Sequence, residues 1–291
     1  GDSYYFILIT YQYIKQSGDR SLLDAEASGM TVRMRLKKAF EAYCVDPETQ
    51  LCFTEYGRRA VDWGFCDTMR KSGYLLMPSV LRANAAAAMA DMTDDPEEKR
   101  KYSAFRERIK RSVCDILYDG DTGWLWSASE KCRQHDVWAT AYAVYSGMLS
   151  GEKLEKTLSA LAEGYVSGTA VRNGSVRHIK TDEDWSPESA WEDTNGIAKG
   201  TYQNGAWWPT ATGWYIYSLW LKDTDLAVRC IRDHISYTES EIHNGAPCEW
   251  FDPDSGERSG LRYGTSAALP YAAPRRLAEA YPAAAEITAD I

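Results

Sequence analysis

Carboxylates in aromatic surroundings are the residues of this sequence best suited to chemistry. Asp62 and Asp67 lie on either side of Trp63 in the segment RRAVDWGFCDT, residues 58–68. A carboxyl group held against an indole ring is poorly solvated, which favours its protonated form and suits a general acid. The alternative is that one aspartate caps a local turn or pairs with Arg59. Both aspartates are therefore candidate catalytic acids.

A third candidate carboxylate is Glu249, in the segment PCEWFDPDSGE, residues 247–257. The residues from 252 to 256 have the composition of a tight turn, and Glu249 precedes them among apolar and aromatic neighbours. A glutamate in such surroundings is costly unless it is paired or used. The acidic residues of this segment lack the regular spacing of a calcium-binding loop, so we expect no metal site here.

Further side chains suit the recognition of a sugar. The chain has 11 Trp and 19 Tyr but only 6 Phe, which favours rings with a polar edge. In the segment YQNGAWWP, residues 202–209, two amides offer hydrogen bonds to hydroxyl groups and two indole rings offer flat faces. The alternative is that this segment caps a helix and its Trp pair fills the top of a helical hairpin. The expected substrate-binding residues are Trp63, Gln203, Asn204, Trp207, Trp208 and Trp250.

A repeated pair of helices must position these residues. Four segments of fourteen or fifteen residues are almost free of charge, and a helix that is apolar on nearly every side is buried on nearly every side. After each comes a polar turn and then a segment with charges on one face and apolar residues at helical spacing. The uncharged segments are 3–16, 79–92, 136–149 and 207–221, and the amphipathic segments are 22–43, 96–117, 152–166 and 224–242. With a ninth helix from about Thr265, the expected fold class is all-α.

The connections between helices predict where the candidate residues meet. Connections within a pair are short, whereas the connections 44–78, 118–135, 167–206 and 243–264 are long and should emerge on one face. The sequence predicts one strand pair, a small β-hairpin that turns at Asn173-Gly174 inside a long loop. Carboxylates on opposite sides of a ring of helical pairs would lie well apart. Glycoside hydrolysis with inversion needs an acid and a base roughly 6.5–9.5 Å apart, so this arrangement favours inversion over retention.

Three segments resemble motifs of the six-hairpin glycosidases, whose catalytic domain is an (α/α)6 toroid. They are GDSYYFILITYQYIKQSGD at the start, YQNGAWWP, and CEWFDP with the following glycine and Thr265-Ser266. The superfamily includes amylo-α-1,6-glucosidases, trehalases, processing α-glucosidases and, more distantly, α-L-rhamnosidases. The resemblance implies that Glu249 is the catalytic base and that the acid lies near Trp63, and of the two aspartates we prefer Asp67. It also implies a single toroid domain over residues 1–291 that lacks the N-terminal helices of a complete ring.

Charge, hydropathy and cysteine content limit the partners. The formal net charge is −9 and no basic cluster occurs, which argues against binding to nucleic acid. No apolar run is long enough to span a membrane. Seven cysteines form no CxxC pair and four histidines form no metal-binding spacing, so we expect reduced thiols, no metal and no cofactor. Reduced thiols slightly favour the cytoplasm over a secreted location, and the expected partner is an oligosaccharide or glycoside substrate.

Two other functions fit parts of the sequence. A polysaccharide lyase on a similar helical ring would use a base such as His with a nearby Arg, and His135 and the pair Arg177-His178 are candidates. A carbohydrate-binding protein without catalysis would need none of the three carboxylates. An inverting glycosidase that acts on a glucoside or related hexoside accounts for Glu249 and the aspartates together, and it is the function that we expect.

Overall fold

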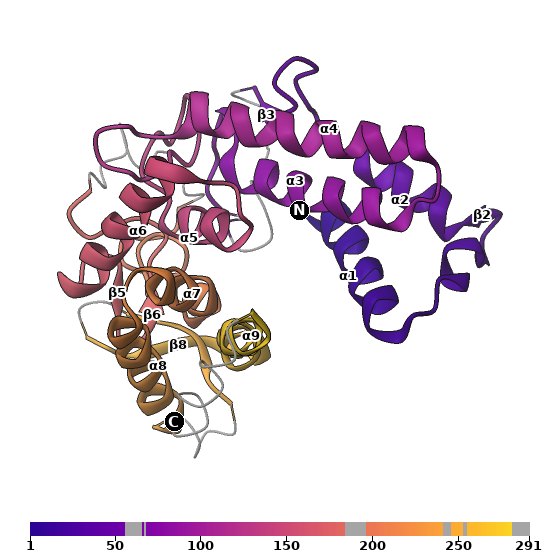
Figure 1. Ribbon diagram of the computed structural model, residues 1–291. Helices are drawn as coiled ribbons and strands as arrows, with labels where there is room; N and C mark the ends of the chain where they lie inside the picture. The colour runs from indigo at the N-terminus through magenta and orange to yellow at the C-terminus, as the bar shows by residue number, and fades with distance from the viewer. Residues whose placement is uncertain (56–65, 67, 184–195, 241–245, 253–254, 281–291) are drawn as a thin grey trace. The chain divides into compact units, whose positions relative to one another are not determined.

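The computed structural model describes residues 1–55, 66, 68–183, 196–240, 246–252 and 255–280 (Figure 1). The chain forms two compact units. The first comprises Gly1–Leu117 with Ala128–Lys131, and the second comprises Tyr118–Ser127 with Cys132–Ile291. Within the described ranges, no helix combines the length and the apolar character needed to cross a membrane.

The first unit contains two helical pairs and two short strand pairs. Its helices are α1 (Asp2–Ser17), a 3-10 turn (Ser21–Asp24), α2 (Val32–Phe40), α3 (Leu76–Met92) and α4 (Pro96–Ser112), which continues as a π-helical turn over Val113–Leu117. Its strands are β1 (Glu26–Ala27) with β2 (Met30–Thr31), and β3 (Phe53–Thr54) with β4 (Gly73–Tyr74), both pairs antiparallel. The start of α4 follows from its sequence, because Pro96 occupies the first turn and the Asp95 carboxylate accepts a bond of 2.8 Å from the Glu97 N–H.

The helix expected over residues 22–43 is wrong in its first ten residues, because α2 begins only at Val32. The chain turns at Ser28-Gly29, where φ is 50° and 74°, and the two flanking strands β1 and β2 pair there. Two successive residues with positive φ end any right-handed helix. Helix α2 then begins at Val32, where the Thr31 hydroxyl caps it by accepting from the Met34 N–H.

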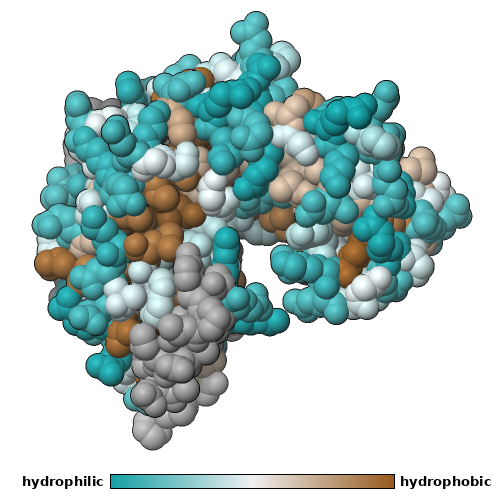
Figure 2. All heavy atoms as spheres, viewed as in Figure 1, coloured by the Kyte–Doolittle hydropathy of each residue, from teal (hydrophilic) through white to brown (hydrophobic). Residues whose placement is uncertain are grey.

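Helix α1 is less covered than its uncharged sequence predicts. Its inner face, with Tyr4 and Ile7, is fully buried, but Ile9 on the opposite face is 70% exposed. Helix α3, of similarly uncharged composition, buries fourteen of its seventeen residues. Figure 2 shows that hydrophilic residues cover much of the visible face and that hydrophobic patches interrupt them.

The second unit repeats the helical pair around a central helix, α7. Its helices are α5 (Val137–Tyr145), α6 (Gly151–Val166), a 3-10 turn (Pro209–Ala211), α7 (Thr212–Lys222), α8 (Thr224–Glu239) and α9 (Gly264–Ala280) (Figure 1). Helix α7 packs against α5, α6, α8 and α9. Aspartates begin two of the helices: Asp136 accepts from the Ala139 N–H before α5, and Asp223 accepts from the Asp225 and Leu226 N–H groups before α8.

Two hairpins decorate the second unit. Strands β5 (Val171–Arg172) and β6 (Ser175–Val176) pair around Asn173-Gly174, where φ is 50° and 65° at the two turn residues, so the predicted two-residue hairpin is confirmed. A second hairpin, β7 (Cys248–Phe251) with β8 (Arg258–Arg262), was not expected from the sequence. The predicted all-α class with a small hairpin is confirmed for the described chain, and the extra strand pairs are all short.

Candidate active site

The structure describes six of the nine candidate residues. Asp62, Trp63 and Asp67 lie outside the described residues. The remaining six all belong to the second unit, in two segments, 202–208 and 248–252.

Glu249 lies on strand β7, directly opposite an irregularity in strand β8. Trp250 pairs with Ser259 and Cys248 pairs with Arg262, so one residue of β7 faces two residues of β8, Gly260 and Leu261. Gly260 has a φ of 78°, which is the left-handed glycine that characterises this kind of β-bulge. Glu249 is half-buried. Bulges re-aim side chains next to functional sites in many proteins.

The other edge of β7 joins the segment with the tryptophan pair. Trp207 and Phe251 exchange two backbone hydrogen bonds, of 3.1 and 3.0 Å, and Trp208 exchanges two with Val176 of β6, of 3.1 and 2.8 Å. The backbone therefore connects β8, β7, residues 207–208 and β6 in that lateral order. Two of the long connections, 167–206 and 243–264, therefore meet here and bring Glu249 and Trp250 beside residues 207–208.

Trp207 and Trp208 are core residues in this structure. They are 2% and 1% exposed. The Trp207 ring stacks on Phe251 at 6.3 Å between centroids, and the Trp208 ring meets Trp138 edge to face at 5.9 Å. Neither ring offers an open face in this structure, and their stacking on a sugar stays a prediction. Trp250 is half-buried and keeps part of its surface in contact with solvent.

Gln203 and Asn204 lie in a tight turn that a buried arginine anchors. Gln203 is fully buried, and the Asn204 amide donates a bond of 2.8 Å to the Ile197 carbonyl. Gly205 has a φ of 113°, and its carbonyl accepts a bond of 2.8 Å from Arg177 Nε. The Arg177 guanidinium also lies 5.2 Å from the Trp207 ring centroid, within the range of a cation–π contact. The predicted contacts of both amides with a substrate stay predictions.

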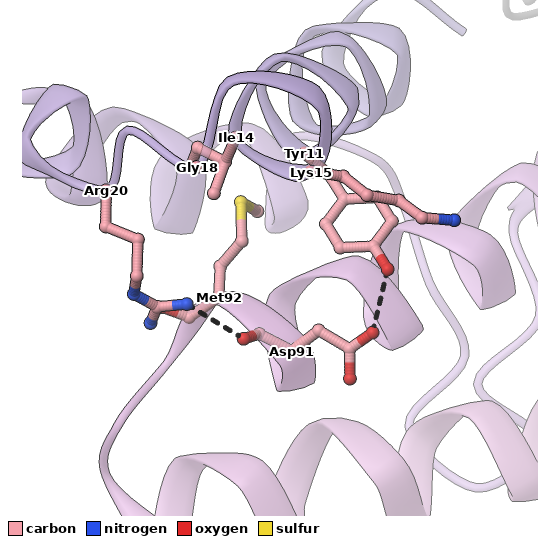
Figure 3. A pocket seen from close by; sticks show the side chains of 7 residues that line it. All are labelled: Tyr11, Ile14, Lys15, Gly18, Arg20, Asp91 and Met92. Atoms are coloured by element: carbon pink, nitrogen blue, oxygen red, sulfur yellow. Dashed lines mark hydrogen bonds between the residues drawn. The ribbon is translucent and has the colours of Figure 1, made fainter.

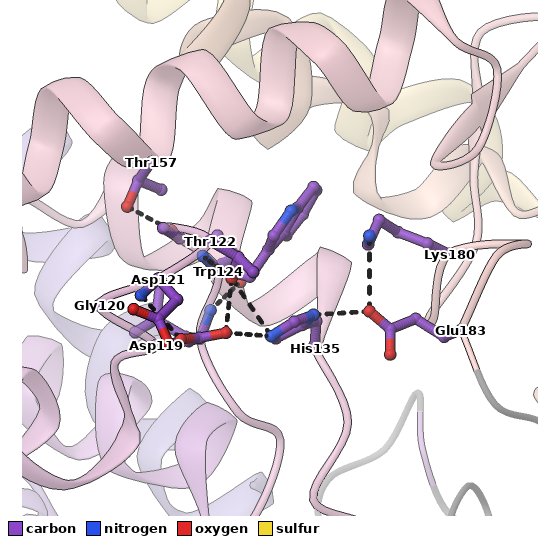
Figure 4. Close-up of polar contacts among 12 residues, drawn as sticks. Asp119, Gly120, Asp121, Thr122, Trp124, His135, Thr157, Lys180 and Glu183 are labelled. Carbon is purple, nitrogen blue, oxygen red and sulfur yellow. Dashed lines mark hydrogen bonds and ion pairs between the residues drawn. The ribbon is translucent and has the colours of Figure 1, made fainter.

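A polar cluster in the same unit surrounds His135 (Figure 4). The Nε2 atom of His135 lies 2.8 Å from Asp119 Oδ2, and its Nδ1 atom lies 2.6 Å from Glu183 Oε1. The imidazole ring stacks on Trp126 at 4.1 Å between centroids, and Lys180 Nζ lies 3.4 Å from Glu183. A carboxylate only accepts hydrogen bonds and a neutral imidazole carries one N–H, so both contacts are hydrogen bonds when the ring is protonated.

The hydrogen bonds and positive charges of this cluster lower the pKa of its two carboxylates more than burial raises it. Burial raises the pKa of Glu183, but the hydrogen bond from His135 and the positive charges of His135 and Lys180 lower it more, so the pKa lies below its ordinary value. Burial likewise raises the pKa of Asp119, and the Thr122 hydroxyl, the Asp121 N–H and His135 together lower it below its ordinary value. Through His135, the cluster connects the loop after residue 117 with residues 180–183.

The positions of the histidines do not suit the base of a lyase. Both nitrogens of His135 are engaged by carboxylates. His178 is 1% exposed, and its ring stacks on Trp138 at 3.9 Å between centroids. A base must reach the proton that it abstracts, and neither ring has access to a substrate in this conformation.

The first unit contains a separate hollow of about 260 Å³ between α1 and α3 (Figure 3). Two of its side chains form hydrogen bonds across it: the Tyr11 hydroxyl donates to Asp91 at 2.9 Å, and Arg20 donates to the Met92 carbonyl at 2.8 Å. None of the nine candidate residues lines it. Arg20 thus satisfies backbone carbonyls at the C-terminal end of α3, which is a structural role rather than a catalytic one.

Three solved structures of glycosidases have this fold. They are a sialidase (TM-score 0.59, 14% identity over 88% of this chain), a rhamnosidase from Klebsiella oxytoca with rhamnose bound (0.55, 16%, 90%) and a neutral trehalase from Saccharomyces cerevisiae (0.53, 12%, 98%). This chain spans 23%, 42% and 64% of their respective lengths. No family model matches the sequence, and no curated protein matches it. The resemblance to the α/α-toroid glycosidases is thus confirmed at the level of the fold.

The sequence marks Glu249 as a candidate but gives no prediction of the glycine that faces it on the next strand. An isolated glycine between Ser259 and Leu261 is a signal for a β-bulge once the flanking residues are recognised as a strand. The alternation in this short segment was too weak to predict the strand. The cluster around His135 depends on loops that meet only after folding, and no local pattern marks it.

Proposed function

We propose that the protein is a glycoside hydrolase that cleaves a glucoside or related hexoside with inversion, and that Glu249 is its general base. The observation that carries this proposal is the setting of Glu249. Its half-buried carboxylate lies on a bulged hairpin, at the place where the connections 167–206 and 243–264 meet. The fold shared with a sialidase, a rhamnosidase and a trehalase supports the same reaction class.

The reaction assigns one role to each carboxylate. Asp67, or in its place Asp62, protonates the glycosidic oxygen as the bond from the anomeric carbon to that oxygen breaks. The Glu249 carboxylate removes a proton from a water molecule, whose oxygen attacks the anomeric carbon from the opposite face. The products are a sugar of inverted anomeric configuration and the free alcohol. Trp63 and Trp250 would stack on the sugar, and Gln203, Asn204, Trp207 and Trp208 would form the second layer of the binding site.

Replacement of Glu249 by Gln tests the base directly. We expect Glu249→Gln to lower kcat by at least about 100-fold, because a positioned general base contributes roughly 10²–10⁴-fold to the rate. Binding of the substrate and the melting temperature should stay close to those of the wild type, since Gln has the same shape. Release of reducing sugar from a panel of glucosides, rhamnosides and trehalose measures the rate.

Glu257→Gln is the matched control. Glu257 lies in the loop of the same hairpin and is exposed, so the same loss of charge there should leave kcat unchanged. A Glu249→Gln variant with wild-type turnover would remove the assignment. Equal losses in both variants would show that charge on the hairpin matters, rather than the position of one carboxylate.

The same panel separates the alternative functions. A lyase would form an unsaturated product that absorbs in the ultraviolet, and a hydrolase releases reducing sugar without that absorbance. A carbohydrate-binding protein would show heat of binding in calorimetry and no product. The engaged or buried histidines argue against the lyase.

A further inference from the structure

The hairpin that carries Glu249 places a glycine directly beneath its side chain. A Cβ atom added to Gly260 would lie 2.6 Å from Glu249 Oε2, 2.7 Å from Glu249 Cβ and 3.0 Å from Trp250 Nε1. Contacts below 3.0 Å force atoms to move. Rotation of the side chain could move the carboxylate away from such a contact. It could not move Cβ, because Cβ is bonded directly to the backbone. The whole Glu249 side chain would therefore have to shift.

The backbone at this point also requires glycine. Gly260 has a φ of 78°, and the bulge that it forms sets two residues of β8 against Glu249 alone. Without the bulge, Glu249 would face an ordinary cross-strand partner whose side chain stands beside it on the same face. Of the two residues that the bulge sets against Glu249, Gly260 has no side chain.

We propose that Gly260 is a positioning residue: it leaves the space in which the Glu249 carboxylate is held for catalysis. The inference rests on the proposed function, because it assumes that Glu249 is the base. It extends that function by assigning the orientation of the base to the opposite strand. Residues that act in this way change kcat, since a displacement of about 1 Å in a reacting group costs roughly 100-fold in rate.

Gly256 provides a matched control on the same hairpin. Its φ is 71°, close to that of Gly260, but a Cβ atom added there would have no neighbour within 4 Å. The substitutions Gly260→Ala and Gly256→Ala therefore impose similar backbone strain. Only the first one places an atom against Glu249.

The experiment compares kcat, KM and melting temperature for the wild type and both variants. We expect Gly260→Ala to lower kcat by about 100-fold with little change in KM, whereas Gly256→Ala keeps the wild-type kcat. Gly256→Ala measures the effect of the backbone strain alone on the melting temperature, and Gly260→Ala should lower the melting temperature at least as much. Combining Gly260→Ala with Glu249→Gln should cause no further loss beyond that of Glu249→Gln, because the residue that Gly260 positions has already been disabled.

The outcomes separate this inference from the proposed function. Equal kcat values for Gly260→Ala and Gly256→Ala, with Glu249→Gln inactive, would overturn the positioning role and leave the function standing. An active Glu249→Gln variant would overturn both. Should Gly260→Ala fail to fold, Gly260→Asn against Gly256→Asn repeats the comparison, because Asn tolerates positive φ and still carries a Cβ atom.

Discussion

The surroundings of Glu249, the proposed base, come from its own hairpin and from two other segments, residues 207–208 and helix α8. Strand β8 provides the bulge at Gly260, and Trp207 pairs with Phe251 on the far edge of β7. Phe251 packs on Trp207 and on Tyr237 of α8, so this buried aromatic cluster holds strand β7 in place. A rigid strand holds a reacting group more tightly than a loop does.

The general acid is tested by its dependence on the leaving group. If Asp67 is the acid, Asp67→Asn should lower kcat by roughly 10²–10⁴-fold on a sugar–sugar bond, whose leaving alcohol needs a proton. The same variant should lose much less on a nitrophenyl glycoside, because nitrophenolate leaves without protonation. Rates on the two substrates, measured for both aspartate variants, check the assignment.

Asp62→Asn is the internal control for that comparison. A dependence on the leaving group that appears only in Asp62→Asn would transfer the acid role to Asp62. If neither variant distinguishes the two substrates, the acid lies elsewhere in the chain.

At the scale of elements, local sequence signals predicted the helices better than the strands. The starts of α4 and α8 follow from Asp95-Pro96 and Asp223-Thr224, whose capping chemistry is complete within a few residues. The hairpin at Asn173-Gly174 was also predictable, because its turn is local. Strands β7 and β8 could not be predicted from local sequence, since a bulge and a long-range pairing with Trp207 define them.

Helix α8 and the β5–β6 turn enclose a buried histidine that should make stability depend on pH. His234 is 2% exposed, and burial lowers its pKa from 6.5 to about 4. Between these values the unfolded chain binds a proton at His234 and the folded chain does not, so the free energy of unfolding falls as the pH falls. The loss should reach roughly 2 kcal/mol between pH 6.5 and about pH 5, at 1.36 kcal/mol per pH unit.

The variant His234→Phe should flatten that dependence, because Phe fills the site without titrating. Chemical denaturation over this pH range measures the free energy of unfolding for both proteins, and their difference isolates His234 from the other histidines. Thr238→Val is the control, since it removes the 3.4 Å contact with His234 Nε2 and leaves the titration in place. Parallel curves for the wild type and His234→Phe would show that His234 does not couple to folding.

At the scale of the whole molecule, two units share one building plan. Helical pairs recur in both, and the uncharged helices α3 and α5 are buried on nearly every side, as their composition predicts. Helix α1 departs from that rule with Ile9 exposed. The fold class could be derived from the sequence because charge and apolar periodicity repeat. The contacts of the candidate site could not, because they join loops that are separated by tens of residues.

The central claim is that Glu249 activates the water that attacks the sugar, and rescue of Glu249→Ala by azide tests it most directly. The shorter side chain leaves room for a small anion that needs no base. The account predicts that sodium azide restores turnover of Glu249→Ala and that proton NMR shows a glycosyl azide of anomeric configuration opposite to that of the substrate. A glycosyl azide with the configuration of the substrate, or an inactive variant that azide leaves inactive while substrate still binds, would contradict it.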